Sequence, residues 1–314
     1  MKVLVRVPAT TANLGPGFDC LGLALSIRNT LAFEDSQDGL RVEWRNCAAA
    51  ACIDPAPSDP AHLPSLRDNL VLRAMDACFE KARVRAPRLK VRITNCIPIG
   101  RGLGSSAAAI VGGLVAANAW CGAPLSHEEL VALAARLEGH PDNVSAALLG
   151  GLTISVMEGD RVVTRRLSPP RSWRAVLFIP VQRLSTRLAR SVLPRRVPRA
   201  DAIFNIGRTP LLVQAFAEAD AGILGLAMQD ALHQPYREAL IPGMAELFEA
   251  ARRAGACGVA LSGAGPTLLA LAENAEQGER VRRAFEREAR ALGVVGRPCI
   301  ARLSPRGAEA RVIP

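Results

Sequence analysis

Lysine and tyrosine are almost absent from this sequence. Lys2, Lys81 and Lys90 are the only lysines among 39 basic residues, and Tyr236 is the only tyrosine. The net charge of +10 is therefore carried by arginines, which are spread along the chain apart from a cluster at Arg187–Arg199. A basic protein can bind nucleic acid, but base stacking needs aromatic side chains, and these make up only 4% of the residues. We expect no nucleic-acid partner.

A long apolar run is also missing. The most apolar stretch, Ala107–Trp120, is short for a membrane span and rich in glycine and alanine, so we expect a core helix there. The N-terminus alternates polar and apolar residues over Lys2–Val7, which predicts a strand rather than a signal peptide. These patterns predict no membrane partner and a cytoplasmic location.

The cysteines lack the spacing of a metal site. None of the eight forms a Cys-x-x-Cys pair, and no cluster of histidines accompanies them, which argues against zinc. In a cytosolic chain we expect them to be reduced and packed as small hydrophobic residues. They are Cys20, Cys47, Cys52, Cys78, Cys96, Cys121, Cys257 and Cys299.

The length of 314 residues exceeds the size at which a single hydrophobic core usually stops growing, so two domains are expected. Hydrophobic residues make up 49% of the chain and charged residues 22%, as in ordinary globular proteins. The pattern changes after Gly150-Gly151, where two strand-like segments and Pro169-Pro170 follow. The predicted domains are residues 1–158 and 159–314.

Periodicity predicts strands and helices in segregated runs rather than in a regular alternation, which favours an α+β fold. Strands are expected at Lys2–Val7, Leu89–Ile93, Gly151–Val156, Arg161–Leu167 and Ala175–Ile179, with a pair around Ser262–Pro266 and one more near the C-terminus. Helices are expected at Asn69–Lys81, from the capping box of Ser126 and Glu129 to Leu137, and at Thr186–Leu193, Arg199–Ala219, Met244–Ala254 and Glu276–Leu292. The segment Cys47–Pro64 is predicted to be an irregular surface excursion.

A glycine-rich segment, Pro98–Ala108, carries the strongest chemical signal. It reads PIGRGLGSSAA, follows a predicted strand and opens the predicted core helix. Glycines let the backbone approach a ligand closely, and the free amide groups and dipole at a helix start favour phosphate. The segment lacks the Gly-Lys-Ser/Thr ending of a P-loop. It predicts a phosphate-binding loop of another type.

This loop resembles the phosphate loop of the GHMP kinases, a family that includes galactokinase, homoserine kinase, mevalonate kinase and phosphomevalonate kinase. Pro8–Asp19, PATTANLGPGFD, is similar to the first motif of the family in its homoserine kinase form. Leu261–Thr267, LSGAGPT, is similar to the third motif. Three motifs in the family's order make the resemblance specific, and it extends over nearly the whole chain. It implies an N-terminal α+β nucleotide domain and a C-terminal ferredoxin-like domain.

Three further segments resemble the homoserine kinase branch of this family. They are Glu138–Val144 (EGHPDNV), Leu184–Pro194 and His233–Pro242. The segment Cys47–Pro64 does not match, and Arg187–Arg199 is richer in arginine than the family pattern. The resemblance implies a kinase that transfers phosphate from ATP to the side-chain hydroxyl of L-homoserine, a step toward threonine. A homodimer is compatible with this resemblance.

The resemblance and the chemistry of phosphate together predict the nucleotide and metal ligands. Mg²⁺ prefers hard oxygen donors, so Glu138 with Ser105 or Ser106 is expected to hold it, and Ser106 is preferred. The alternative for Glu138 is a surface carboxylate at a helix end. The residues expected at ATP are Asn69, Pro98, Ile99, Gly100, Arg101, Gly102, Leu103, Gly104, Ser105, Ser106, Ala107 and Ala108.

An amino-acid substrate needs an anion for its ammonium group and cations for its carboxylate. Asp19 and Asp142 are candidates for the first role, and Arg190 and Arg237 are candidates for the second, since guanidinium groups bind carboxylates in a bidentate manner. The resemblance adds His140, Thr186 and Gly265 to the substrate site, although His140 could instead orient its turn. Asp142, Asn143 and Asn13 are the predicted catalytic residues, with Asx turns as the alternative for the two asparagines.

Two questions remain open at the level of sequence. Asp142 could act as a general base on the substrate hydroxyl, or transfer could proceed without a base because the transition state is loose. Other functions weighed are a sister kinase that acts on mevalonate or a methylerythritol derivative, and a catalytically silent ligand-binding protein. The complete phosphate loop, with Glu138 and Asp142, argues against the silent protein.

Overall fold

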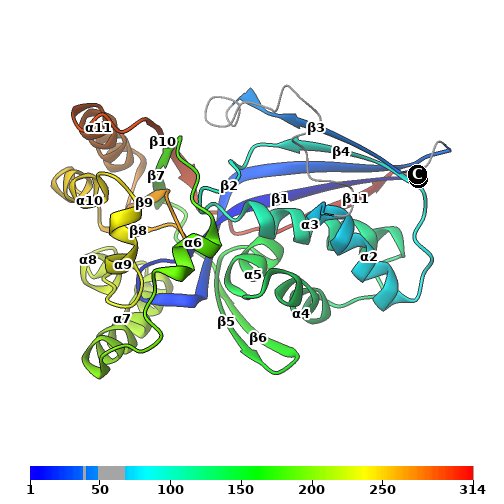
Figure 1. Cartoon of the computed structure of the whole chain (residues 1–314), viewed down its shortest axis with the longest axis horizontal. Coiled ribbons are helices and arrows are strands. Elements are labelled where there is room, and N and C mark those ends of the chain that lie inside the picture. Colours follow the sequence, from blue (N-terminus) through cyan, green and yellow to red (C-terminus); the bar gives the residue numbers. More distant parts are fainter. Residues whose placement is uncertain (38–39, 49–67, 314) are drawn as a thin grey trace.

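The computed structural model describes residues 1–37, 40–48 and 68–313, and these form two adjoining sheets with helices packed on them (Figure 1). The larger sheet has seven strands in the order β11-β1-β2-β4-β3, and a β5–β6 hairpin pairs with the first part of β2. Its strands are β1 (Lys2–Asn13), β2 (Gly17–Asp35), β3 (Arg41–Asn46), β4 (Leu89–Asn95), β5 (Leu152–Glu158), β6 (Arg161–Leu167) and β11 (Glu309–Ile313).

The long hairpin of β1 and β2 organises this sheet. Its antiparallel register runs from Lys2 opposite Glu34 to Asn13 opposite Gly17, with irregularities after Pro8 and after Ala12. Because the register shifts at these points, the strands bend where the first motif lies. The last strand, β11, returns from the C-terminus to pair with β1, so both ends of the chain contribute to one sheet.

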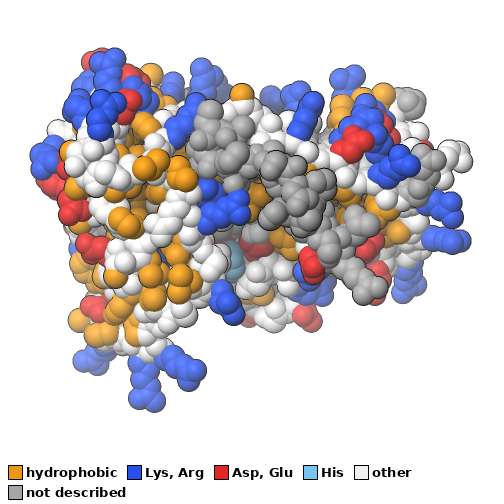
Figure 2. Space-filling model, turned by 45° about the horizontal axis from the view of Figure 1, so that its top comes forward, with side chains coloured by type: hydrophobic (Ala, Val, Ile, Leu, Met, Phe, Trp, Pro, Cys, Tyr) orange, Lys and Arg blue, Asp and Glu red, His pale blue; other side chains and the backbone are white. Residues whose placement is uncertain are grey.

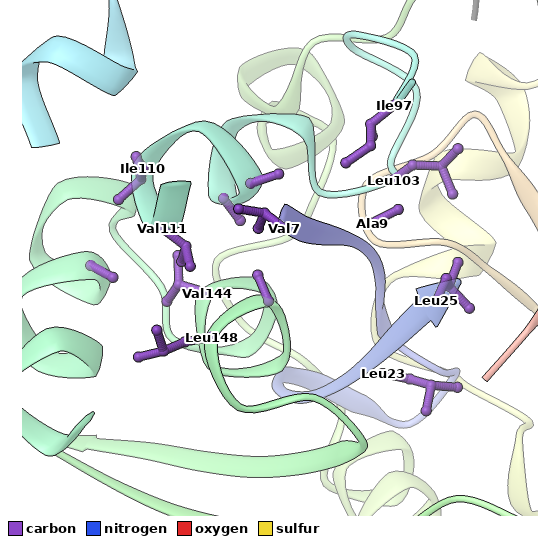
Figure 3. Packing of buried hydrophobic residues seen from close by; sticks show 14 of the residues in the cluster. Val7, Ala9, Leu23, Leu25, Ile97, Leu103, Ile110, Val111, Val144 and Leu148 are labelled. Atoms are coloured by element: carbon purple, nitrogen blue, oxygen red, sulfur yellow. The ribbon is translucent and has the colours of Figure 1, made fainter. Parts of the chain in front are cut away.

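Four helices lie on one side of the larger sheet (Figure 1). They are α2 (Leu70–Ala82), α3 (Ser105–Trp120), α4 (His127–Glu138) and α5 (Asp142–Leu149). Helix α3 is apolar around its circumference, and ten of its sixteen residues are buried, as expected for a helix packed on all sides. Figure 3 shows Ile110 and Val111 of α3 beside Val7 of β1 and Val144 of α5. This packing fixes the start of α3, and hence the phosphate loop, against the sheet.

The smaller sheet is antiparallel with the order β10-β7-β9-β8. With the helices between its strands, this order is that of a ferredoxin-like domain. Its strands are β7 (Arg174–Pro180), β8 (Gly258–Leu261), β9 (Leu268–Ala272) and β10 (Gly296–Arg302). The helices of this half are α6 (Thr186–Ser191), α7 (Arg199–Glu218), α8 (Leu224–Ala227), α9 (Gln234–Arg237), α10 (Met244–Arg253) and α11 (Ala275–Ala291), with a 3₁₀ turn at Glu238–Leu240.

Strand β7 joins the two halves because it is buried on both faces. Val176 and Phe178 pack in a core with α10 and α11, whereas Ala175, Leu177 and Ile179 belong to the larger core shared with the first sheet. Successive side chains of a strand point to opposite faces, so one strand serves two cores. The relative placement of the two halves is therefore determined by packed side chains and not by a linker alone.

The predicted α+β, two-domain fold is confirmed. The helix opened by the Ser126 capping box is present, and its reciprocal hydrogen bonds with Glu129 are both formed. The strands β2 and β3 were not predicted. The division into residues 1–158 and 159–314 stays a prediction, since β6 and β11 from the second range pair within the first sheet. Positions 49–64 of the predicted surface excursion lie outside the described residues.

One prediction about the cysteines is wrong. Cys47 and Cys96 form a disulfide, with their Cα atoms 5.2 Å apart, within the range that a disulfide spans. They meet because β3 and β4 run parallel, with Asn46 opposite Asn95 at their ends. Cys20, Cys78, Cys121, Cys257 and Cys299 are free thiols, as predicted. None of the helices within the described ranges is long and apolar enough to cross a membrane.

Helices α2 and α3 approach each other at a glycine. A methyl group on Gly113 would lie 2.3 Å from the carbonyl oxygen of Val71. We therefore predict that Gly113→Ala lowers the free energy of unfolding by about 1–3 kcal/mol, because the helices must move apart. Chemical denaturation measures this change. The matched control is Gly112→Ala, whose methyl would meet side chains and no backbone atom among its nearest neighbours, Leu31 at 3.1 Å and Val7 at 3.4 Å. Equal effects of the two substitutions would contradict the prediction.

Candidate active site

A cavity of about 370 Å³ lies between the two halves of the molecule. Its lining includes the end of β1, the start of β2, the glycine-rich loop, the starts of α2, α3 and α5, helix α6, Arg237 and the β8–β9 loop. Figure 2 shows a hollow between the halves in which a histidine and acidic side chains are visible beside basic ones. Segments far apart in the sequence thus supply one concave site, as in most small-molecule sites.

Three segments cross at the end of this cavity that the glycine-rich loop forms. The amide of Thr10 donates to the carbonyl of Leu103 at 3.2 Å, and the hydroxyl of Ser262 donates to the carbonyl of Gly102 at 2.6 Å. The amide of Gly263 donates to the carbonyl of Ala12 at 3.1 Å. The three sequence motifs are therefore held together by direct hydrogen bonds.

Glycine is required at this crossing. Gly102 and Gly104 have φ values of 73° and 66°, in the left-handed region. A methyl group on Gly102 would lie 2.2 Å from the carbonyl oxygen of Ser262, and one on Gly104 would lie 1.9 Å from the hydroxyl of Thr10. Both glycines thus allow a neighbouring segment to approach, in addition to any approach by phosphate.

The start of α3 is open to an acceptor. The first amide groups of any helix lack an intrahelical partner, and here the cap residue, Gly104, has no side chain that could accept from them. The hydroxyl of Ser106 donates to Oε1 of Glu138, which stands at the end of α4. Burial raises the pKa of the Glu138 carboxyl, and the Ser106 hydroxyl opposes that shift. A hydroxyl and a carboxylate therefore meet beside the site where phosphate is expected.

The start of α5 carries the acidic centre of the cavity. Asp142 is only 2% exposed, and its Oδ1 atom accepts from the amide of Asn143 at 2.6 Å and contacts Nδ1 of His140 at 2.6 Å. The Asn143 side chain donates to the same oxygen and accepts from the hydroxyl of Thr10 at 2.7 Å. Oδ1 is therefore occupied, whereas Oδ2 has no hydrogen-bond partner within the described chain and is open to a ligand.

The other end of the cavity carries charged groups of both signs. Arg190 of α6 donates two hydrogen bonds to the carboxylate of Asp19, at 2.9 and 2.7 Å. Arg237 is 1% exposed, and both guanidinium groups lie 5.5 Å from the ring centre of Phe18. Burial and the nearby charge of Arg190 lower the pKa of Arg237 to about 10, so it remains a cation at neutral pH.

The structure brings nearly all the predicted residues to this cavity. Asn13, Asp19, Asn69, Glu138, His140, Asp142, Asn143, Thr186, Arg190, Arg237 and Gly265 line it, as do Ile99, Gly100, Arg101, Gly102, Gly104, Ser105, Ser106 and Ala108 of the loop. Pro98, Leu103 and Ala107 do not, and the last two are buried in the core. The individual roles of these residues stay predictions.

Three of the predicted ligands also have structural roles. The guanidinium of Arg101 donates to the carbonyls of Pro180 and Val181 at 3.1 and 2.7 Å, and so attaches the loop to the end of β7. The side chain of Asn69 caps α2. The side chain of Asn13 donates to the carbonyl of Gly263 and accepts from the amide of Asp19, both at 3.0 Å.

Sequence reasoning did not single out two aromatic residues of this site. Phe18 lies within the first motif and under both arginines. His233 is fully buried, and its ring stacks on Phe18 with centres 5.2 Å apart. The spacing of His233 and Arg237, four residues apart, is that of neighbours on a helix face, and it could have identified His233.

Among the residues that the structure describes, one cluster of possible metal ligands lies in the cavity. Ligand atoms of Asp19, His140 and Asp142 all lie within 4.8 Å of one another. Asp19 already pairs with Arg190, and Asp142 with His140. A magnesium ion prefers oxygen ligands, so the Glu138 and Ser106 oxygens suit it better than a cluster that includes an imidazole.

Comparison with known proteins identifies the family. The model of the GHMP kinases N terminal domain matches residues 69–151, and that of the GHMP kinases C terminal matches residues 212–291. The chain belongs to the GHMP kinases, a family of ATP-dependent small-molecule kinases.

Similar sequences and structures indicate which branch of the family the chain resembles most. The homoserine kinase of Moorella thermoacetica is 49% identical over 85% of this chain and 86% of its own, and that of Synechococcus is 45% identical over 98% of both. The crystal structure of homoserine kinase from Cytophaga hutchinsonii is 28% identical, with a TM-score of 0.86 over 99% of this chain and 97% of that one. These relatives belong to the homoserine kinase branch of the family.

The contact between His140 and Asp142 has a measurable consequence. Burial alone would lower the pKa of His140, but the hydrogen bond and charge of Asp142 outweigh it, so the pKa is raised. We predict by NMR titration a His140 pKa above about 6.5, and a lower value in Asp142→Asn. The stabilisation from His140 is full below its unfolded-state pKa and is lost as pH rises through the raised folded-state value. The NMR signal of His140 is assigned by its loss in His140→Gln. An unchanged pKa in Asp142→Asn would exclude this coupling.

Proposed function

We propose that this chain transfers the γ-phosphoryl group of ATP to the side-chain hydroxyl of L-homoserine, giving O-phospho-L-homoserine and ADP in the route to threonine. The single observation that supports it best is the pairing of Asp19 with Arg190 beside Arg237, at one end of a cavity whose other end is the phosphate loop. The names of the relatives agree with this substrate.

The zwitterionic end of homoserine suits the charged groups of this pair. Its carboxylate can accept hydrogen bonds from Arg237 and Arg190, while its ammonium group can donate to Asp19. Nη2 of Arg237 has no hydrogen-bond partner within the described chain, because Nε donates to Ala189 and Nη1 donates to Gly263 and His233. Two points of attachment orient the side-chain hydroxyl toward the phosphate loop, and orientation is a large part of the catalysis of phosphoryl transfer.

ATP is expected to place its phosphates at Gly100–Ser106, at the start of α3. Mg²⁺ fits the oxygens of Ser106 and Glu138, which already contact each other and include one carboxylate. The ion would neutralise charge on the transferred phosphoryl group. The raised pKa of Glu138 has burial as its main cause, and a buried carboxylate is stabilised by a cation.

The hydroxyl proton has two routes. Asp142 can accept it at Oδ2, since Oδ1 already serves Asn143 and His140. In the second route the proton leaves late, because a loose transition state requires little activation of the nucleophile, and Asp142 then only holds the hydroxyl. His140 would hold Asp142 in place under either route.

Two alternatives fit the site less well. Mevalonate kinase shares the fold, as in the L. major enzyme in complex with R-mevalonate, which is 17% identical with a TM-score of 0.71. Mevalonate has a carboxylate for the arginines but no ammonium group for Asp19. A silent binding protein does not require Glu138 and Ser106 beside the phosphate loop. The cytoplasmic location and the homodimer stay predictions.

The substrate is tested by ADP release with L-homoserine, L-homoserine amide, L-serine and mevalonate. We predict high turnover with homoserine and strong discrimination against the amide. In Arg190→Ala, kcat/KM for homoserine should fall about tenfold to a hundredfold, as expected for a lost charged hydrogen bond, with the KM for ATP unchanged. The control is Arg187→Ala, an exposed arginine on the same helix. Equal turnover of mevalonate and homoserine would remove the assignment.

The metal role of Glu138 is tested by Glu138→Gln, which removes the charge and keeps the shape. We predict a loss of kcat of at least tenfold and a requirement for more Mg²⁺, since the contact serves the transition state more than substrate binding. Steady-state kinetics across a range of Mg²⁺ concentrations measure both. Glu129→Gln, which alters the capping box of the same helix, is the control. Unchanged turnover at every Mg²⁺ concentration would exclude Glu138 from the site.

A further inference from the structure

His233 lies behind the substrate end of the cavity and is fully buried. Its Nε2 atom lies 2.8 Å from the carbonyl oxygen of Gly15, and its Nδ1 atom lies 3.1 Å from Nη1 of Arg237. A carbonyl can only accept and a guanidinium can only donate. The ring therefore carries its proton on Nε2 and accepts a hydrogen bond at Nδ1.

The surroundings keep this ring neutral. Burial and the charge of Arg237 lower the pKa of His233, while Asp230 and Asp19 oppose them. Asp230 faces the ring at 3.4 Å, but its carboxylate is occupied by the amides of Leu232, His233 and Gln234. A neutral imidazole is the form that can accept from Arg237.

Arg237 is held on three sides. Nε donates to the carbonyl of Ala189 at 3.0 Å, and Nη1 donates to the carbonyl of Gly263 and to His233, both at 3.1 Å. Arg237 lines the cavity although it is only 1% exposed, and Nη2 is not among the fully buried atoms that lack a partner. Within the described chain, Nη2 is therefore the donor group of Arg237 that is left for a ligand in the cavity.

The same ring also holds the turn that precedes Asp19. The hydrogen bond from Nε2 fixes Gly15, where no side chain would fit because a methyl group would lie 2.1 Å from the carbonyl oxygen of Met228. The ring stacks on Phe18, the neighbour of Asp19. One side chain therefore contacts both the cation and the turn beside the anion of the proposed amino-acid site.

We infer that His233 is a positioning residue for the substrate carboxylate, acting by accepting a hydrogen bond from Arg237 so that Nη2 of the guanidinium faces the ligand. The inference rests on the proposed function. In it, His233 is neutral and orients the charged guanidinium of Arg237. If the buried acceptor is removed, the charged donor is left unpaired. We expect the guanidinium then to leave its position in the site.

The test compares His233→Leu with His233→Asn. Leucine removes the acceptor, whereas the side-chain oxygen of asparagine can occupy roughly the position of Nδ1 and accept from Arg237. The readout is the ratio of kcat/KM for L-homoserine to that for L-homoserine amide. We expect His233→Leu to reduce this ratio about tenfold or more, mainly through the KM for homoserine, with the KM for ATP within about twofold of the parent. His233→Asn should recover most of the ratio.

A merely structural role would give a different result. Equal losses on homoserine and its amide, or an equal loss for ATP, would overturn the inference, as would His233→Asn behaving like His233→Leu. His127→Leu, on the surface at the start of α4, controls for the loss of a histidine, and thermal unfolding checks that each variant is folded.

A second measurement does not depend on the substrate. We expect ¹⁵N NMR of the ring of His233 in the parent to show a protonated Nε2 and an unprotonated Nδ1 at neutral pH. A proton on Nδ1 would overturn the inference even if homoserine is the substrate. A parent enzyme that does not phosphorylate homoserine would instead overturn the proposed function, and the NMR result would still report whether His233 accepts from Arg237.

Discussion

The crossing of three loops at Gly102 and Gly104 is the constraint on which the site depends. Each glycine lies against a backbone or hydroxyl oxygen at a distance that excludes any side chain. Hydrogen bonds from Thr10 and Ser262 then fix the loop from both domains. Because the first and third motifs also bond to each other, the phosphate loop cannot move independently of the segments that hold the amino-acid end. Distance and direction between the two ends of the cavity are thereby set by the fold.

At the end of the cavity opposite the glycine-rich loop, burial determines the charged state and the pairing of the ionisable side chains. Arg237 is almost inaccessible, and burial lowers its pKa to about 10, so it stays charged at neutral pH. Three acceptors surround its guanidinium. Asp19 and Arg190 neutralise each other across the cavity. Under the proposed function, a zwitterionic ligand would exchange this internal pair for one contact to each residue, so that neither charge is left unpaired. This exchange supports an amino acid as the proposed substrate.

The sequence was sufficient for the residues whose type is set by local chemistry. The glycines of the loop, Ser106 with Glu138, and the two arginines follow from motifs, and all of them meet at the cavity. What could not be predicted depends on contacts between distant segments. The pairing of β11 with β1, the disulfide of Cys47 with Cys96 and the hydrogen bond of Thr10 to Asn143 leave no local pattern. Nothing in the sequence shows which polar residues of a motif face a ligand.

Asn143 and Asp142 illustrate the difference between a polar residue that faces a ligand and one that is held by its neighbours. Both residues were predicted to be catalytic from one motif. In the structure, the Asn143 side chain accepts a hydrogen bond from Thr10 and donates one to Asp142. Oδ1 of Asp142 contacts both Asn143 and His140. Oδ2 of Asp142 has no hydrogen-bond partner within the described chain. Under the proposed function, the neighbours of Asp142 direct this oxygen toward the substrate hydroxyl whether or not it takes the proton, and alignment is a large part of the catalysis of phosphoryl transfer. The polar network around α5 would then restrict direction at the hydroxyl, as we infer for His233 at the carboxylate.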